Sequence, residues 1–132
     1  MGEGVLRIRL LRVRVHAYAS EDLDRVRMAV ENAVGILDEP PVTRYLEGYF
    51  GDRITAMEYV MKDGEKALEI LRRILKHIGM SNVGVEERSK NNGVIHLRID
   101  KQAACMGEIR VGEADAIKLE FSYEGDLGEL MG

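Results

Sequence analysis

The sequence predicts a two-layer α+β domain, in which a mixed sheet of about five strands is covered on one face by two amphipathic helices. Several stretches alternate apolar and ionisable residues with a period of two, which is typical of half-buried strands. Two longer stretches repeat apolar residues every three or four positions, which is typical of helices. Two helices that each bury one apolar stripe can cover one sheet face and leave the other open.

The first strand is expected over residues 5–19, where arginines alternate with apolar residues. The alternation changes phase at Leu10-Leu11, and such a slip moves every later side chain to the other face, so a β-bulge is expected near Leu10. Beyond the slip, basic and aromatic side chains share one face: Arg12, Arg14, His16 and Tyr18. Such a face suits contact with phosphates and bases. The alternative is a solvated face whose arginines discourage edge pairing.

Two helices are expected, each with its own start and stop signals. The first should begin after a Ser20 cap and run from Leu23 to about Ile36, before the prolines at 40 and 41. The second should span residues 65–78 and end at Gly79. Its acids come early and its bases late, as the helix dipole favours. This order explains Arg72, Arg73 and Lys76 without a ligand.

Residues 42–50 and 53–61 are expected to form two strands joined by a turn at Gly51-Asp52. Gly48 lies within the first of them, which indicates a bulge or a close backbone approach. Tyr45 and Tyr49 fall on one side of that strand. They could stack bases, or they could cover the sheet as half-buried tyrosines.

The stretch 94–107 is expected to be a strand followed by a short capped turn. Its alternation stops at Asp100, whose carboxylate can cap the next residues, and Gly107 can end the turn. This arrangement brings Arg98, Asp100, Lys101 and Gln102 to one corner, which is either a binding corner or a set of solvated charges. The dipeptide Asn92-Gly93 predicts the preceding turn, after a short strand near residues 83–85.

The remaining stretches complete the expected single domain of residues 1–132. A last strand should cover residues 116–123, and residues 124–132 should form a flexible, acidic, glycine-rich tail. The one cysteine, Cys105, reads as a small buried packing residue. It excludes an internal disulfide and fits a reducing cytosol, so a cytoplasmic protein is expected. No apolar run is long enough to span a membrane, and no signal peptide is visible.

The sequence contains no motif that points to catalysis. Glycine loops for phosphates are absent, no Ser-His-Asp set stands out, and the three histidines lack metal-ligand spacing, although His16 and His96 could meet across strands. No enzyme activity, cofactor or metal is therefore expected. The net charge of −4 argues against a generic nucleic-acid binder. A chain whose acids gather near its C-terminus can still hold a local basic patch.

Three stretches resemble motifs of one family. They are residues 16–34 (HAYASEDLDRVRMAVENAV), 47–62 with its E-G-aromatic-x-G-x-x-I pattern, and 97–109 with its L-R-hydrophobic-D-K-Q-A-A pattern. Together they resemble an archaeal family of predicted RNA-binding or exosome-associated proteins. The resemblance implies an α+β fold related to a ribosomal large-subunit protein and to the double-stranded-RNA-binding domain. The positions that match the family's motifs are Glu47, Gly48, Gly51, Arg98, Asp100, Lys101 and Gln102.

Two functions remain open from the sequence. The first is a non-catalytic RNA-binding protein, an accessory factor of RNA processing or degradation. Its RNA would lie over the open sheet face, with phosphate contacts from Arg12, Arg14, Arg98 and Lys101, Gln102 at the same corner, and base stacking on Tyr18, Tyr45 or Tyr49. The second is a subunit that docks a protein partner, or a second copy in a homodimer, on the same face.

Overall fold

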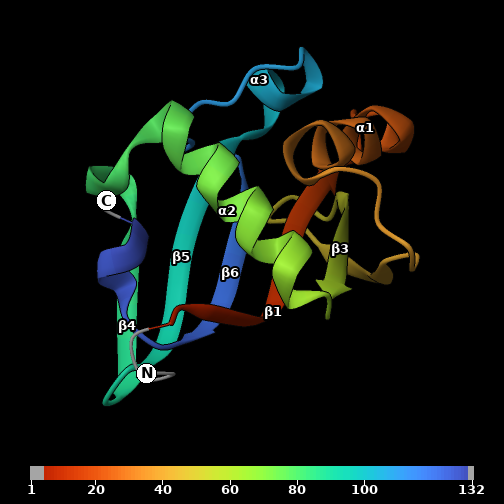
Figure 1. Cartoon of the computed structure of the whole chain (residues 1–132). Coiled ribbons are helices and arrows are strands. Elements are labelled where there is room, and N and C mark those ends of the chain that lie inside the picture. Colours follow the sequence, from red (N-terminus) through yellow and green to blue (C-terminus); the bar gives the residue numbers. More distant parts are fainter. Residues whose placement is uncertain (1–4, 131–132) are drawn as a thin grey trace.

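The computed structural model describes residues 5–130, and within them one antiparallel sheet carries three α-helices (Figure 1). The sheet has six strands in the order β2-β3-β1-β6-β5-β4. The first strand along the chain, β1, therefore lies beside the last one, β6, in the centre. The strands are β1 (Arg7–Tyr18), β2 (Val42–Glu47), β3 (Arg53–Met61), β4 (Gly84–Ser89), β5 (Asn92–Asp100) and β6 (Ala116–Glu124).

The helices α1 (Leu23–Val34) and α2 (Gly64–Ile78) cover one face of this sheet, and α2 crosses in front of it in Figure 1. A third helix, α3 (Lys101–Cys105), packs against α1 at the end of β5. The core lies between sheet and helices. Val13, Leu119 and Leu97 stand opposite one another on β1, β6 and β5 and are almost completely buried. No helix of residues 5–130 covers the other face of the sheet, which is here called the open face.

The predicted α+β layering is confirmed, but two of its details are wrong. All five strand pairings are antiparallel, so the sheet is not mixed. The sheet also has six strands and not about five, and the short strand expected near residues 83–85 is the start of β4, which runs to Ser89 along the edge of the sheet. Every residue of β4 is exposed, so no apolar alternation marked its full length in the sequence. None of the described helices is long and apolar enough to cross a membrane.

Of three local features predicted from the sequence, the bulge and the Asp100 cap are present, and the Ser20 cap is not. The bulge is confirmed, since the register of β1 against β6 shifts between Ile8 and Leu10. The Asp100 cap is also confirmed, because its carboxylate accepts from the Ala103 N–H at 2.8 Å. The Ser20 cap is wrong: Asp22 caps α1 by accepting from the Asp24 N–H at 2.9 Å. A cap must precede the first helical turn directly, and Ser20 lies too far upstream.

The predicted Asn92-Gly93 turn is also wrong, since both residues belong to β5. The turn is formed by Lys90 and Asn91, and Asn91 takes the positive φ of 59° that asparagine tolerates well. Gly93 is needed for a different reason. A Cβ at this position would overlap the carbonyl oxygen of Glu86 on the neighbouring strand.

The C-terminal stretch is partly ordered. Glu124 is the last residue of β6, and residues 127–130 form the 3-10 helix η3 (Leu127–Leu130). Leu127 and Leu130 pack against the core. Residues 131 and 132 of the expected tail lie outside the described residues. The structure therefore anchors most of a segment that its glycine and acid content had suggested to be flexible.

Gly64 is expected to be essential for stability, because α2 begins against the backbone of β1. A Cβ on Gly64 would overlap the carbonyl oxygen of Ile8, and backbone cannot move aside cheaply. Gly64→Ala should therefore destabilise the protein by about 2 kcal/mol, as overpacking does, and thermal unfolding should show the melting temperature falling by roughly 6–10 °C. Gly84→Ala is the matched control, since its Cβ would meet only His96 at ordinary contact distance. Equal melting temperatures for the two variants would contradict this prediction.

Candidate nucleic-acid interface

Three cationic side chains stand in a line across the middle of the open face. The register pairs Arg14 of β1 with Lys118 of β6, and Lys118 with Arg98 of β5. Directly paired residues of antiparallel strands point to the same face, so the three charges are neighbours. Like charges placed opposite one another destabilise a sheet. The fold gives no reason for this cationic row (Arg14, Lys118 and Arg98), which makes it a candidate for binding an anion.

The first member of the row is held by two carboxylates. The Arg14 Nε donates to Glu58 Oε1 at 2.8 Å, and its Nη1 lies 3.1 Å from Glu120 Oε1. Arg12, one step along β1 on the same face, lies 3.4 Å from the same Glu58 oxygen. The hydrogen bond raises the pKa of Arg14 and lowers the pKa of Glu58. The two arginines are thus fixed in position and partly neutralised.

The other two members of the row are not neutralised in this way. Lys118 and Arg98 are both exposed, and neither forms an ion pair with any of the residues 5–130 that the structure describes. Arg44 on β2 adds a further exposed cation to this face, because it pairs with Ala56, which in turn pairs with His16 of β1. The middle of the open face therefore carries five Lys and Arg side chains and two glutamates: Arg12, Arg14, Arg44, Arg98, Lys118, Glu58 and Glu120.

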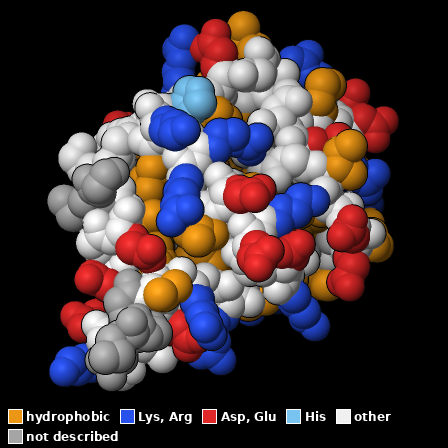
Figure 2. Space-filling model, in the orientation of Figure 1, with side chains coloured by type: hydrophobic (Ala, Val, Ile, Leu, Met, Phe, Trp, Pro, Cys, Tyr) orange, Lys and Arg blue, Asp and Glu red, His pale blue; other side chains and the backbone are white. Residues whose placement is uncertain are grey.

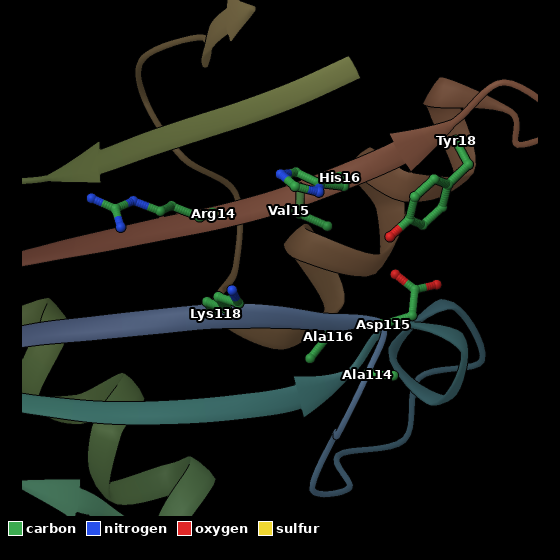
Figure 3. Close-up of a pocket in the computed structure, with 8 residues that line it drawn as sticks. All are labelled: Arg14, Val15, His16, Tyr18, Ala114, Asp115, Ala116 and Lys118. Carbon is green, nitrogen blue, oxygen red and sulfur yellow. The ribbon is translucent and has the colours of Figure 1, made fainter. Parts of the chain in front are cut away.

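A pocket opens at one end of the cationic row, where β1 and β6 separate (Figure 3). Their pairing ends at Arg14 and Lys118, and beyond it the pocket reaches about 130 Å³. In Figure 3 the Tyr18 ring and the Asp115 carboxylate point toward one another across this gap. The lining residues are Arg14, Val15, His16, Tyr18, Ala114, Asp115, Ala116 and Lys118.

The prediction that Lys101 is available to phosphates is wrong. Lys101 is completely buried, and its ammonium group donates to the carbonyl of His16 at 2.9 Å and to Glu21 Oε1 at 2.7 Å. Its Nζ also lies 2.9 Å from Asp115 Oδ1. These three partners occupy the three N–H groups of an ammonium. Lys101 therefore ties together the end of β1, the start of α1 and the start of β6.

This buried cluster shifts the pKa values of its members. Burial by itself would raise the pKa of the Glu21 carboxyl, but hydrogen bonds from Lys101 and from the Tyr18 N–H outweigh it, so the net pKa is lowered. Burial by itself would lower the pKa of Lys101, but Glu21 and Asp115 outweigh it, so the net pKa is raised. Both groups are therefore stabilised in their charged forms.

The other members of the predicted corner have local roles. Asp100 caps α3, and Gln102 is exposed on α3 close enough to Glu21 to lower the pKa of its carboxyl. Cys105 is only partly buried, and its Sγ lies 3.4 Å from the carbonyl oxygen of Arg25. The predicted packing role of Cys105 is confirmed, because it packs against the core, although its burial is only partial.

The hairpin between β2 and β3 explains the motif glycines. The Gly48 N–H donates to the carbonyl of Asp52 at 2.6 Å, and Gly51 has a φ of 81°, which favours glycine. Glu47 pairs with Arg53 across the base of the loop. The motif of Glu47, Gly48 and Gly51 thus closes a tight loop.

The predicted tyrosines do not gather on one face. Tyr45 pairs with Thr55, which faces the helices, so Tyr45 lies on the opposite side of the sheet from the cationic row. There it is covered by the guanidinium of Arg53, 3.6 Å from the ring centre. Tyr49 lies at the hairpin tip, 95% exposed and in edge contact with Phe50. Tyr18 alone of the three lines the pocket beside the row.

Sequence analysis missed two residues of this site, Lys118 and Asp115. Lys118 lies within the last predicted strand, but only the strand order shows that it stands between Arg14 and Arg98. Asp115 precedes a strand and carried no pattern at all. The same strand order separates His16 from His96, since β6 lies between β1 and β5. In the described part of the chain, no group of three or more His, Cys, Asp and Glu could hold a metal ion.

The opposite face of the molecule has a different charge pattern. Figure 2 shows the helix-covered side, where Lys and Arg side chains gather around a histidine in the upper part of the view, and Asp and Glu side chains lie mostly below and to the right. Such a separation has a local cause on a helix: α2 carries an acid in its first turn and the basic residues Lys76 and His77 in its last turn, as the helix dipole favours. On the open face it is the strand register that brings basic side chains together.

A family model described as RNA binding matches residues 10–123, which run from the β1 bulge to the end of β6. The chain belongs to this RNA-binding family. The cationic row and the Lys101 cluster both lie inside the matched residues. The loop motif of the β2–β3 hairpin lies inside them as well.

Relatives of the family come from archaea. The chain is 29% identical over 123 residues to an RNA-binding protein of Pyrococcus abyssi, a match that covers 86% of this chain and 80% of that protein. The structure of the present chain is similar to that of a DUF54 protein from Methanothermobacter thermautotrophicus, with a TM-score of 0.73 and 26% sequence identity. The match covers 95% of this chain and 91% of that protein. A DUF54 protein from Sulfolobus solfataricus shares the fold, with a TM-score of 0.65, 20% identity and 86% coverage of each chain.

Proposed function

We propose that this chain binds RNA across its open sheet face, along the cationic row. The observation that carries the proposal is the row itself. Three cations stand side by side on the three strands β1, β6 and β5 of a protein whose net charge is −4. Membership of an RNA-binding family supports a polyanion as the ligand that this arrangement serves.

The members of the row are suited to different parts of the task. Arg14 is fixed by Glu58 and Glu120, so its remaining N–H groups are held ready at one position. Lys118 and Arg98 are exposed and can move to meet phosphates. Strands are about 4.8 Å apart in a sheet, so the row spans about 10 Å. The RNA backbone would therefore cross the strands, from β1 towards β5.

The proposal is of a binding protein without catalytic activity, because the face offers positive charge and aromatic surface but no arrangement that we can assign to a reaction. The resemblance to exosome-associated proteins adds an accessory role in RNA processing or degradation. Co-purification of exosome subunits with the tagged chain from its own cell extract, retained after ribonuclease treatment, is the expected result. Loss of those subunits on ribonuclease treatment would contradict the proposed association with the exosome, and the proposal of RNA binding would stand without it.

A salt titration tests the RNA proposal. RNA affinity should fall as salt rises, because each phosphate neutralised releases a counterion, with a slope of roughly 0.7 log units per log unit of salt for single strands. Contacts from Arg14, Lys118, Arg98 and Arg44 would give a slope of roughly 3. Fluorescence anisotropy with a labelled 12-nucleotide RNA from 50 to 400 mM salt measures it. Absent binding, or binding that salt does not change, would contradict the proposal.

A protein partner or second copy is the other candidate, and one observation favours it. Both edge strands of the sheet, β2 and β4, have every residue exposed. Edge strands are available for pairing with a strand from another chain. Light scattering coupled to gel filtration distinguishes this candidate. A stable dimer whose formation is prevented by proline within β4 would support it, and a monomer at high concentration would exclude self-association.

A further inference from the structure

We propose that the pocket beside the cationic row holds one unpaired RNA base that carries an exocyclic amino group, with Asp115 as the hydrogen-bond acceptor. This inference rests on the proposed RNA binding and specifies which form of RNA the face prefers. It is carried by the shape of the pocket, by the fixed carboxylate inside it, and by the aromatic rings that line it.

The pocket lies where a base would leave a backbone that follows the row. Arg14 and Lys118 belong both to the row and to the pocket wall, so a phosphate bound to them lies at the pocket mouth. The volume of about 130 Å³ is far more than one water molecule needs, which is roughly 10–15 Å³. A planar ring is a suitable occupant. Sequence-specific recognition of RNA commonly places splayed-out bases in such sites.

Asp115 is held in one orientation by a buried cation. Its Oδ1 lies 2.9 Å from the Lys101 ammonium, which is completely buried, while the Asp115 side chain is 39% exposed. Glu21 already provides Lys101 with a carboxylate at 2.7 Å. Asp115 is therefore the second of two carboxylates on this ammonium, and its contact with Lys101 uses one of its two oxygens. One oxygen of Asp115 is fixed, and the other remains an acceptor beside the pocket.

A carboxylate next to a phosphate-binding row is unfavourable unless a hydrogen-bond donor compensates for it. The edges of RNA bases supply such donors. Adenine, cytosine and guanine each present an amino group, and Asp or Glu accepting from the amino group of cytosine is a known pairing. Uracil presents a single N–H between two carbonyl oxygens, which a carboxylate repels. The pocket should therefore prefer an amino-bearing base over uracil.

Two rings provide stacking surface. Tyr18 and His16 line the pocket, with their ring centres 6.4 Å apart in an edge-to-face arrangement. The Lys101 ammonium lies 4.9 Å from the centre of the Tyr18 ring and fixes its position. Tyr18 keeps 37% of its surface exposed. Stacking on such rings favours any base, so discrimination between bases falls to Asp115.

The test compares three labelled RNAs at one salt concentration: a 12-nucleotide all-uridine strand, the same strand with one central cytidine, and a blunt duplex. We expect the cytidine strand to bind about tenfold more tightly than the all-uridine strand, and the duplex to bind more weakly than either. Equal affinities of all three RNAs at that salt concentration would overturn the pocket, and a salt titration in which each affinity falls would leave the proposed RNA binding standing. Failure of all three to bind would overturn both.

The variant Asp115→Asn provides a second test, because it should change the preference for cytidine over uridine. Lys101 should hold the amide oxygen, which turns the amide nitrogen toward the pocket as a donor. The preference for cytidine should then disappear or reverse, because uracil offers carbonyl acceptors. Glu113→Gln is the matched control, since it removes one exposed acid two residues away. A cytidine preference that survives Asp115→Asn, in a variant whose melting temperature shows it to be folded, would overturn the assignment of Asp115.

Discussion

Reversing the charge of both Arg98 and Lys118 to glutamate should lower RNA affinity by about two orders of magnitude at 100 mM salt. The two side chains are the exposed members of the cationic row, and among the described residues no carboxylate neutralises them. The variant also adds two carboxylates to the face that holds Glu120 and Glu58, and the resulting four negative charges repel phosphates. The slope of affinity against salt should fall by roughly 1.4, because two phosphate contacts are lost. Anisotropy measurements on the same 12-nucleotide RNA give both numbers.

The helix side of the molecule provides a matched control for this experiment. Arg72 and Lys76 are exposed on α2, and reversing both changes the net charge of the protein by the same amount. If the row is the binding site, this control should lose only a few-fold in affinity, through the long-range field alone. Equal losses in the two double variants would show that RNA responds to net charge and not to the row. Melting temperatures confirm that both variants are folded.

Replacing Lys101 with methionine should destabilise the protein by about 3 kcal/mol, since removing one partner of a buried ion pair is costly. The methionine fills similar space but donates nothing to His16, Glu21 and Asp115. For a chain of this length the melting temperature should fall by roughly 10 °C. Lys90→Met is the control, because Lys90 is exposed in the β4–β5 turn. A loss no greater than that of the control would contradict the role of Lys101.

The same cluster predicts how stability depends on pH. The Glu21 pKa is lowered by folding, so its contribution is present above the ordinary value of 4.5 and is lost as pH falls through the folded pKa. The Lys101 pKa is raised, so its contribution is present below 10.5 and is lost as pH rises through the folded pKa. The gap in unfolding free energy between the wild type and Lys101→Met should therefore be widest near neutral pH and narrow toward pH 3. A gap that does not change with pH would contradict this.

Local sequence patterns were sufficient for the elements and for the bulge, because those features depend on neighbouring residues. Arg12 and Arg14 were correctly placed on one outward face by their alternation with buried valines. The same kind of pattern gave a wrong prediction for Lys101, which was expected to be available to phosphates. It follows an alternating strand and looks like a solvated charge, yet α3 turns it inward beneath α1 and β1. Nothing near Lys101 in the sequence shows that Glu21 and Asp115 will meet it there.

The side of the sheet that Tyr45 faces could not be predicted, for a different reason. Every residue of β2 is exposed, so neither side of this edge strand has the apolar character that would reveal its orientation. The site as a whole needed the strand order. Arg14, Lys118 and Arg98 come from distant parts of the chain, and their alignment depends on β6 inserting between β1 and β5. Periodicity describes which way a side chain points but does not identify its cross-strand neighbours.

The pairing of β1 with β6 has a consequence for how the chain matures during synthesis. Of the six strands, β1 is made first, and it gains its second neighbour only when Ala116–Glu124 has been made. Until then β1 has one bare edge, and contacts between such distant segments form slowly. A nascent chain that stops before Ala116 would lack β6, and with it Ala116 and Lys118 on one side of the pocket. Residues up to Glu124 must therefore have been made before the open face can bind a ligand that spans β1, β6 and β5.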